Sequence, residues 1–191
     1  PWLEQTHRQF GASDRAVTRS TTVVGVRKGG KVAFASDGQV TVQDTIMKQT
    51  AKKVQKVYQG KVLAGYAGTA ADALTMFERF EAKLGETRGN LQRAVQLLAQ
   101  DWRTDRVLRH LEALLLVADK QSMFVVSGQG DVISMEEDVA AIGSGGPFAL
   151  AAAKAMCRHS SLSAEEVARE AVLIAASICI YTNTEVTLLT L

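Results

Sequence analysis

Two neighbouring threonines, Thr21 and Thr22, stand immediately before the apolar, β-branched run of residues 23–26. A threonine hydroxyl is a poor nucleophile unless a base lies beside it. If the chain is cut between Ser20 and Thr21, Thr21 gains a free α-amine, whose pKa of about 8 suits general-base work near neutrality. Thr21 could then act as a nucleophile that carries its own base. The alternative is that the two threonines only begin an edge strand.

Three further features, far apart in the sequence, could join this chemistry. Asp37 ends the next apolar run, Lys53 opens the run after it, and Ser144 lies in a loop of small residues, 143–146. Each feature also has a plainer explanation: aspartate before glycine is common in turns, lysine is mostly exposed, and serine among glycines resembles a phosphate-binding loop. The loop lacks the lysine of a Walker pattern, however. No role is assigned to the histidines, which lack the spacing of a metal site or a serine-type triad: His7, His110 and His159.

The elements that must position these residues follow from apolar spacing and turn signals. The sequence predicts strands over residues 22–27, 31–36, 53–58, 61–66, 114–118, 123–127, 139–143 and 184–191, with Gly29-Gly30 as the first hairpin turn. Helices are expected after Thr69, over residues 90–108, from Pro147, and after a capping box of Ser163 and Glu166. Strands and helices thus form segregated blocks, which predicts an α+β fold with two stacked sheets between helical layers.

The composition narrows the class of protein. The formal net charge of +2 is too small to indicate nucleic acid or a membrane surface as a partner. Cys157 and Cys179 are too few and too far apart for a disulfide framework or a zinc site, and reduced thiols in the cytoplasm fit best. The longest apolar stretch, residues 171–181, is far shorter than the roughly 20 residues of a membrane-spanning helix.

Residues 1–20 differ in character from the rest of the chain. They are polar and contain no apolar segment of the kind that a secretory signal requires. We expect residues 1–20 to form a propeptide and residues 21–191 to form one domain, since 171 residues suffice for a sizeable core.

Ordered sequence blocks extend the pattern along nearly the whole chain. They cover residues 21–24, 36–39, 47–48, 52–54, 64–68, 101–106, 141–147 and 178–183. In these blocks the chain resembles the proteasome-type N-terminal-nucleophile hydrolases, and among them the bacterial peptidase subunits related to proteasome β subunits. It departs from them in its longer segment before Thr21 and in its tail after Asn183.

The resemblance implies a fold and a set of site residues. The fold would be a four-layer αββα sandwich, and Thr21 would be the nucleophile of a threonine-type endopeptidase. Lys53 would lower the pKa of the Thr21 amine, and Asp37 would keep Lys53 charged and in place. Ser144 would hydrogen-bond near that amine, while the Gly65 N–H would face the developing oxyanion, a contribution worth roughly 3 kcal/mol of barrier.

The resemblance also implies a bound monovalent cation, typically sodium, and no organic cofactor. Its ligands would be the backbone carbonyls of Ala176, Cys179 and Thr182, where the family more often has glycine at the first position. A helix C-terminus leaves carbonyls unsatisfied, so a hard cation is chemically reasonable there. The alternative is an ordered water molecule.

The implied partners complete the prediction. The family assembles as two stacked hexameric rings in the cytoplasm and takes unfolded proteins from a partner ATPase, and this chain has no phosphate-binding loop of its own. Neither nucleic acid nor a membrane is expected. Two alternatives stay open: a stand-alone amidase that acts on small molecules, and an inactive structural ring subunit, against which the presence of Thr21, Asp37 and Lys53 argues.

Overall fold

The computed structural model describes residues 21–42, 44–104 and 111–191. Its elements are, in chain order, β1 (Thr22–Lys28), β2 (Lys31–Ser36), β3 (Val40–Val42), β4 (Thr45–Lys48), β5 (Val54–Val57), β6 (Val62–Gly68), α1 (Ala70–Glu86), α2 (Leu91–Thr104), β7 (Ala113–Ala118), β8 (Met123–Ser127), β9 (Val132–Ser134), β10 (Val139–Gly143), α3 (Gly146–His159), α4 (Ala164–Ala176) and β11 (Thr187–Thr190). The predicted propeptide, residues 1–20, lies outside the described residues.

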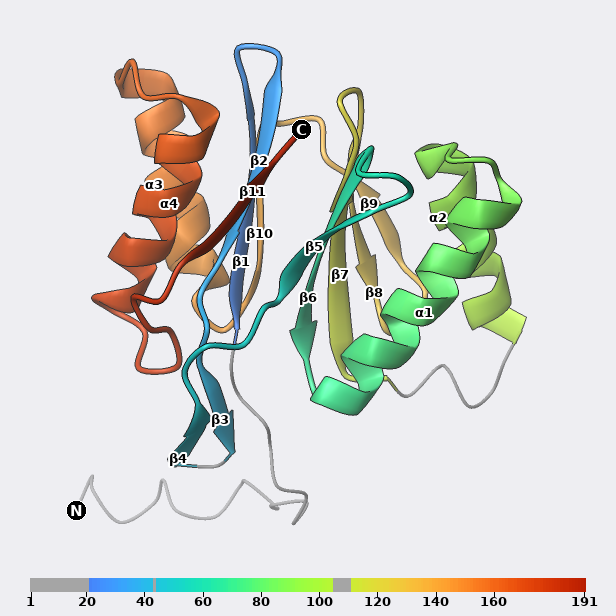
Figure 1. The fold of residues 1–191 in the computed structure, drawn as a ribbon, viewed down its shortest axis with the longest axis horizontal. Coiled ribbons are helices and arrows are strands. Elements are labelled where there is room, and N and C mark those ends of the chain that lie inside the picture. The colour runs from blue at the N-terminus through green and yellow to red at the C-terminus, as the bar shows by residue number, and fades with distance from the viewer. Residues whose placement is uncertain (1–20, 43, 105–110) are drawn as a thin grey trace, which may run out of the picture.

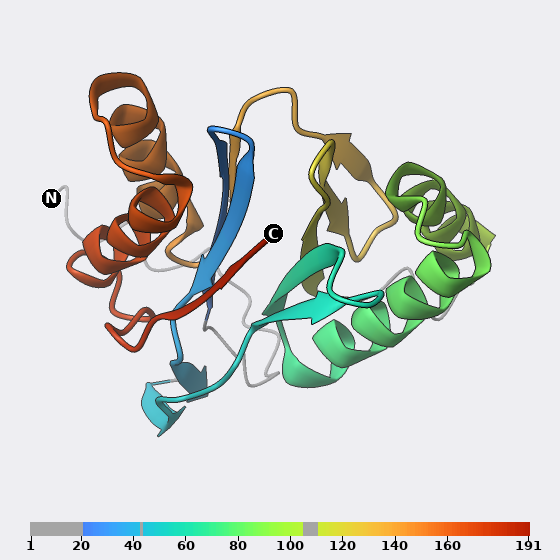
Figure 2. The same ribbon diagram turned by 45° about the horizontal axis from the view of Figure 1, so that its top comes forward.

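Two antiparallel sheets form the centre of the molecule. One has the strand order β10-β1-β2-β11 and the other the order β5-β6-β7-β8-β9, while β3 and β4 form a separate two-stranded sheet. Figure 1 shows the two large sheets facing each other, with α3 and α4 outside the first and α1 and α2 outside the second. Figure 2 shows the same arrangement from another side. The predicted α+β class, with two main sheets and four helices, is confirmed.

Three apolar clusters hold these layers together, and the alternation along β2 explains how. Ala33 and Ala35 belong to a cluster with α3 and α4, whereas Phe34, between them, belongs to the cluster that fills the space between the sheets. Successive side chains of a strand point to opposite faces, so a fully apolar strand is buried on both sides. The third cluster packs α1 and α2 against the five-stranded sheet, around Phe80 and Trp102.

The helices begin where the sequence predicts. Thr69 Oγ1 accepts a hydrogen bond from the Asp72 N–H at 3.3 Å and caps α1. Ser163 and Glu166 exchange both hydrogen bonds of a capping box at the start of α4. Pro147 lies in the first turn of α3, one residue after the helix begins.

The structure differs from the predicted elements in its short strands and in some boundaries. β3, β4 and β9 were not predicted, and all four residues of β4 are exposed, so no buried face imposes an alternating pattern on them. The last strand is shorter than the predicted span of 184–191, since β11 covers Thr187–Thr190. In α2 the described residues end at Thr104, and the predicted extension over 105–108 lies outside them.

None of the helices in the described parts of the chain is long and apolar enough to cross a membrane.

The core between α1 and the five-stranded sheet gives a stability prediction. We expect Phe80→Ala to lower the free energy of unfolding by about 3–5 kcal/mol, because Phe80 is fully buried and its removal leaves a cavity. Urea unfolding at one fixed protein concentration measures this difference. The control is Leu74→Ala on the same helix, where the side chain is 56% exposed and little stability is lost. Equal losses in the two variants would contradict the assignment of this core.

Candidate active site

The start of β1 places Thr21 between the two neighbouring strands of its sheet. Thr22 pairs with Gly143 of β10, and Val23 pairs with Ser36 of β2. Thr21 is only 4% exposed. Gly143 has a φ of +92°, and a Cβ there would collide with the Thr21 carbonyl oxygen, so glycine is required at this close approach. The two strands thus fix the position of Thr21 by backbone pairing.

A buried ion pair lies beside this strand end. The Lys53 ammonium is 3.0 Å from Asp37 Oδ1, and the two side chains are 3% and 0% exposed. The same oxygen, Asp37 Oδ1, accepts the Thr22 N–H at 2.7 Å. One carboxylate oxygen therefore joins the lysine to the residue that follows Thr21. The structure thus brings Asp37 and Lys53 together beside the start of β1, and the pairing of these two residues agrees with the prediction from the sequence.

The remaining polar atoms of the pair are also satisfied. Lys53 Nζ donates to the Gln39 carbonyl at 2.5 Å, and Asp37 Oδ2 accepts the Gln39 N–H at 2.9 Å. Asp37 Oδ2 also accepts the Asn183 N–H at 3.4 Å. Such satisfaction matters because an unpaired charge in the protein interior costs several kcal/mol.

Burial and charge act in opposite directions on the pKa of Lys53. Loss of hydration lowers this pKa from the ordinary value of 10.5, and the attraction and hydrogen bond of Asp37 raise it, with burial the larger influence. Lys53 therefore releases its proton more readily than an exposed lysine does. A lysine of this kind, held in place by a carboxylate, is suited to tuning the charge of a neighbouring amine.

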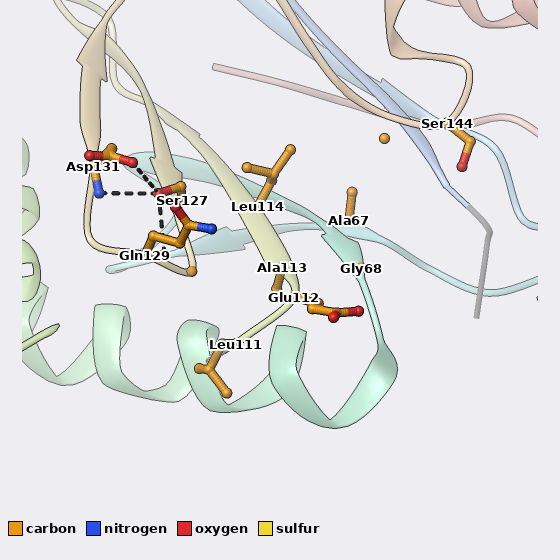
Figure 3. A pocket seen from close by; sticks show the side chains of 12 residues that line it. Ala67, Gly68, Leu111, Glu112, Ala113, Leu114, Ser127, Gln129, Asp131 and Ser144 are labelled. Carbon is orange, nitrogen blue, oxygen red and sulfur yellow. Dashed lines mark hydrogen bonds between the residues drawn. The ribbon is translucent and has the colours of Figure 1, made fainter. Parts of the chain in front are cut away.

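Ser144 lies on the exposed loop between β10 and α3. Together with Gly143 it lines one end of a cavity of about 510 Å³, which also includes Ala67 and Gly68 at the end of β6. Figure 3 shows this cavity, with the turn around Ser127 and Asp131 on the side away from Ser144. The cavity begins at Gly143, the strand partner of Thr22. It is thus an open space next to the start of β1.

Gly65 lies away from this cavity, in the middle of β6. It pairs with Val54 on one side and Leu116 on the other. The N–H of the next residue, Tyr66, donates to the Lys53 carbonyl, so alternation directs the Gly65 N–H toward β7 within the sheet. A Cβ on Gly65 would lie 2.6 Å from Val23 Cγ1, which gives this glycine a packing role between the sheets. Its oxyanion role stays a prediction.

The carbonyls of Ala176, Cys179 and Thr182 come from the end of α4 and the turn that follows. No donor among the described residues contacts the carbonyl oxygens of Ala176 and Thr182, and the Cys179 oxygen accepts only the Thr182 N–H at 3.0 Å. Each oxygen therefore has a lone pair to offer, and an all-oxygen donor set suits a hard cation. The donor chemistry is compatible with the predicted sodium ion, which stays a prediction. In the described residues, no group of acidic, histidine and cysteine side chains forms a metal site.

Sequence reasoning missed several contacts of this site. The side chains of Thr22 and Thr182 form a buried pair of hydroxyls, and the Asn183 side chain accepts the Gly38 N–H. The backbone N–H and carbonyl of Gln39 contact the two members of the ion pair. All four residues lie in sequence blocks that carry the resemblance, which is the one signal that could have drawn attention to them. Apart from the local bond between Gln39 and Asp37, these contacts join residues 14 to 160 positions apart, and sequence spacing does not reveal such contacts.

The buried pair gives a prediction about pH and stability. Asp37→Asn should lower the free energy of unfolding by about 3–5 kcal/mol near pH 7, because it leaves the Lys53 charge buried without a counter-charge. The loss should shrink as the pH rises toward 10.5, since Lys53 then becomes neutral in the folded protein before it does in the unfolded chain. Urea unfolding over this pH range measures both effects.

A matched control is available on the surface. Asp138→Asn removes the carboxylate of an equally short ion pair with Arg27, 3.0 Å long, whose aspartate is 64% exposed. Its cost should stay below about 1 kcal/mol and should not vary over the same pH range. The opposite ranking of the two variants would show that Asp37 and Lys53 are not coupled as described.

Comparison with known proteins agrees with this geometry. The family model described as proteasome subunit matches residues 17–191. Over 173 residues, 90% of this chain and 98% of the relative, the chain is 57% identical to the ATP-dependent protease subunit HslV of Caldicellulosiruptor saccharolyticus. It is 60% identical to the protein of the same name from Thermosipho africanus over 170 residues, 89% of this chain and 97% of the relative.

A solved structure extends the match to three dimensions. The crystal structure of eukaryotic HslV from Trypanosoma brucei superposes with a TM-score of 0.83 at 41% identity and covers 88% of this chain and 98% of its own. The sequence matches and the superposition agree on one family. The chain belongs to the proteasome subunit family, within its HslV group, and it is the threonine peptidase subunit of an ATP-dependent protease.

Proposed function

We propose that Thr21 is the nucleophile of this peptidase and that it becomes competent when residues 1–20 are removed. The observation that carries the proposal is the carboxylate oxygen of Asp37, which contacts both the Thr22 N–H and the Lys53 ammonium. This bridge holds a buried cation beside the residue that would bear the new α-amine. A nearby cation favours the neutral, basic form of an amine and so lowers its pKa.

The proposed reaction uses the Thr21 amine as general base. The amine takes the Oγ1 proton while Oγ1 attacks the substrate carbonyl carbon, and the carbonyl oxygen becomes the oxyanion. When the intermediate collapses, the C–N bond breaks and the leaving amine takes the proton from the Thr21 ammonium. Water, deprotonated by the same amine, then attacks the ester and releases the second product with regeneration of Thr21.

The other predicted site residues have supporting roles in this proposal. Lys53 tunes the amine, Asp37 holds Lys53, and Ser144 hydrogen-bonds near the amine. Gly65 is the oxyanion donor predicted from the sequence, although Gly68 is the β6 glycine that lines the cavity beside Ser144. The cavity of about 510 Å³ gives an extended peptide a place next to the start of β1.

The proposed processing step follows from the same chemistry. While Ser20 is joined to Thr21, the nitrogen of Thr21 is an amide and has no basic lone pair. We propose that Thr21 Oγ1 attacks the Ser20 carbonyl carbon within its own chain, and that the C–N bond breaks as the nitrogen takes the hydroxyl proton. Water then hydrolyses the resulting ester, which releases residues 1–20 as a carboxylate and leaves Thr21 with a free amine and hydroxyl. The φ of +140° at Thr21, unusual for a β-branched residue, supports this step, because cutting the bond removes the constraint.

The family assignment supports the wider context of the proposal. The layer order of helices, sheet, sheet and helices fits the αββα sandwich of the N-terminal-nucleophile hydrolases. The relatives named HslV are described as subunits of ATP-dependent proteases, so we propose two stacked hexameric rings in the cytoplasm. The ATPase HslU, also called ClpY, would deliver unfolded proteins, and sodium on the Ala176, Cys179 and Thr182 carbonyls would stiffen the turn after α4.

The nucleophile is tested by two substitutions at Thr21. Thr21→Ala should abolish cleavage of a fluorogenic peptide and should leave residues 1–20 attached, whereas Thr21→Ser should retain part of the rate because it keeps an activated hydroxyl. Peptide turnover and N-terminal sequencing are the two measurements. Thr75→Ala, which removes a half-buried hydroxyl on α1 that donates to the Ala71 carbonyl, should match the wild type. Turnover by Thr21→Ala at the wild-type rate would refute the mechanism.

The need for the partner ATPase is tested by comparing an unfolded protein substrate with small amide substrates. An unfolded protein should be degraded only when HslU and ATP are both present, because the chain contains no nucleotide-binding motif that could power unfolding. Native mass spectrometry should give two hexameric rings. ATP-independent hydrolysis of small amides by an isolated single subunit would instead favour the stand-alone amidase.

A further inference from the structure

A pair of threonine hydroxyls joins the start of β1 to the turn that follows α4. Thr22 Oγ1 and Thr182 Oγ1 are 2.7 Å apart, and the two residues are 0% and 5% exposed. The residues are 160 positions apart in the sequence. Because the hydrogen bond is buried, water cannot replace either partner, and loss of one hydroxyl leaves the other unsatisfied.

The hydroxyl pair lies on the face of β1 that is opposite to Thr21. Val24 belongs to the cluster shared with α3 and α4, whereas Val23 belongs to the cluster between the sheets. Side chains alternate along a strand, so Thr22 points to the same side as Val24, and Thr21 to the same side as Val23. The hydroxyl pair therefore holds β1 on its α3 and α4 side, at the residue next to Thr21.

The hydroxyl pair also packs against Gly145, the N-cap residue of α3, which follows Ser144. A Cβ on Gly145 would collide with Thr22 Oγ1 and lie 2.6 Å from Thr182 Oγ1. The hydroxyl pair thus packs directly on the backbone of the loop that carries Ser144. Movement of the pair would move this loop as well, because no free space separates them.

The next residue of the turn, Asn183, reaches the ion pair from the other side. Its side-chain oxygen accepts the Gly38 N–H at 3.0 Å, and its amide nitrogen donates to the Gln49 carbonyl at 2.9 Å. Its backbone N–H contacts Asp37 Oδ2 at 3.4 Å. One turn therefore contacts β1, the Ser144 loop and Asp37.

We propose that the Thr182 side chain is a positioning residue of the peptidase. Through the Thr22 hydroxyl it fixes the translation and rotation of the first residue of β1, and so holds the Thr21 hydroxyl and amine against Lys53 and Ser144. The inference rests on the proposed role of Thr21 as nucleophile. Its effect appears in the chemical step, because small misplacement of a reacting group lowers the rate far more than it lowers binding.

The test compares valine and serine at position 182. Thr182→Val keeps the shape and removes the hydroxyl, and we expect a fall in kcat of about tenfold or more with KM within about twofold of wild type. Thr182→Ser keeps the hydroxyl and should restore kcat to within about threefold. Rates are normalised to the fraction of chains that begin at Thr21, measured by intact mass, so that a processing defect is not counted as a catalytic one. Thr87→Val, at the far end of α1, is the control that removes a hydroxyl without touching the site.

A double-mutant cycle makes the test independent of any single variant. Thr22→Val breaks the same hydrogen bond from the other side, and it replaces Thr182→Val if that protein does not fold. If both residues act through one bond, the double variant should lose no more rate than either single variant. Losses that multiply, or a Thr182→Val enzyme with wild-type kcat, would overturn the inference.

Covalent labelling separates this inference from the nucleophile assignment. A peptide vinyl sulfone should modify Thr21 in the wild type, and modification of Thr182→Val should be slower by the same factor as its kcat. A wild-type protein that is labelled elsewhere would refute Thr21 as nucleophile. Labelling of Thr21 at equal rates in both proteins would refute only the positioning role of Thr182.

Discussion

The ion pair between Asp37 and Lys53 is the interaction on which the rest of the site depends. Both groups are buried, and a buried pair is tolerated only where further hydrogen bonds offset its loss of hydration. The two oxygens of Asp37 accept from Thr22, Lys53, Gln39 and Asn183, which come from four separate parts of the chain. The buried pair is stable only when all four segments donate to Asp37, so it favours the one arrangement of the chain that brings them together.

Close packing between the two sheets also stabilises the position of β1. A Cβ on Gly25 of β1 would lie 3.2 Å from Leu116 Cδ2 of β7, and one on Gly65 of β6 would lie 2.6 Å from Val23 Cγ1 of β1. The sheets can approach so closely because these positions carry no side chain. Close-packed interiors deform little, so the strand that begins at Thr22 rests on a stiff base. A stiff base suits a reaction in which the nucleophile and its base belong to one residue.

The sequence predicted the regular elements better than the contacts of the site. Gly29-Gly30, the Thr69 cap and the capping box of Ser163 and Glu166 could be read locally, because each depends on residues a few positions apart. β3 and β4 were missed because exposed short strands carry no burial pattern. The number of main sheets followed from the order of the blocks, but their strand order did not.

Within the site, the residue types and the pairing of Asp37 with Lys53 were predictable, but the other partners were not. Thr21, Asp37 and Lys53 stood out because each chemical type follows or precedes an apolar run. Thr182 was expected to contribute only a backbone carbonyl, yet its side chain is bonded to Thr22. Gly65 was predicted as the oxyanion donor, and its packing against Val23 in mid-strand could not be foreseen from the sequence. Such pairings arise from the tertiary fold, and no local propensity encodes them.

The strand order β10-β1-β2-β11 has a consequence for folding of the chain during its synthesis. A ribosome makes β1 and β2 before the other described strands, but β10 and β11, the outer neighbours of that hairpin, are the last two described strands to emerge. The hydroxyl of Thr182 arrives 160 positions after that of Thr22. During translation the would-be nucleophile is therefore a loose hairpin end without its surroundings. The order of synthesis therefore delays assembly of the surroundings of Thr21 until the domain is nearly whole.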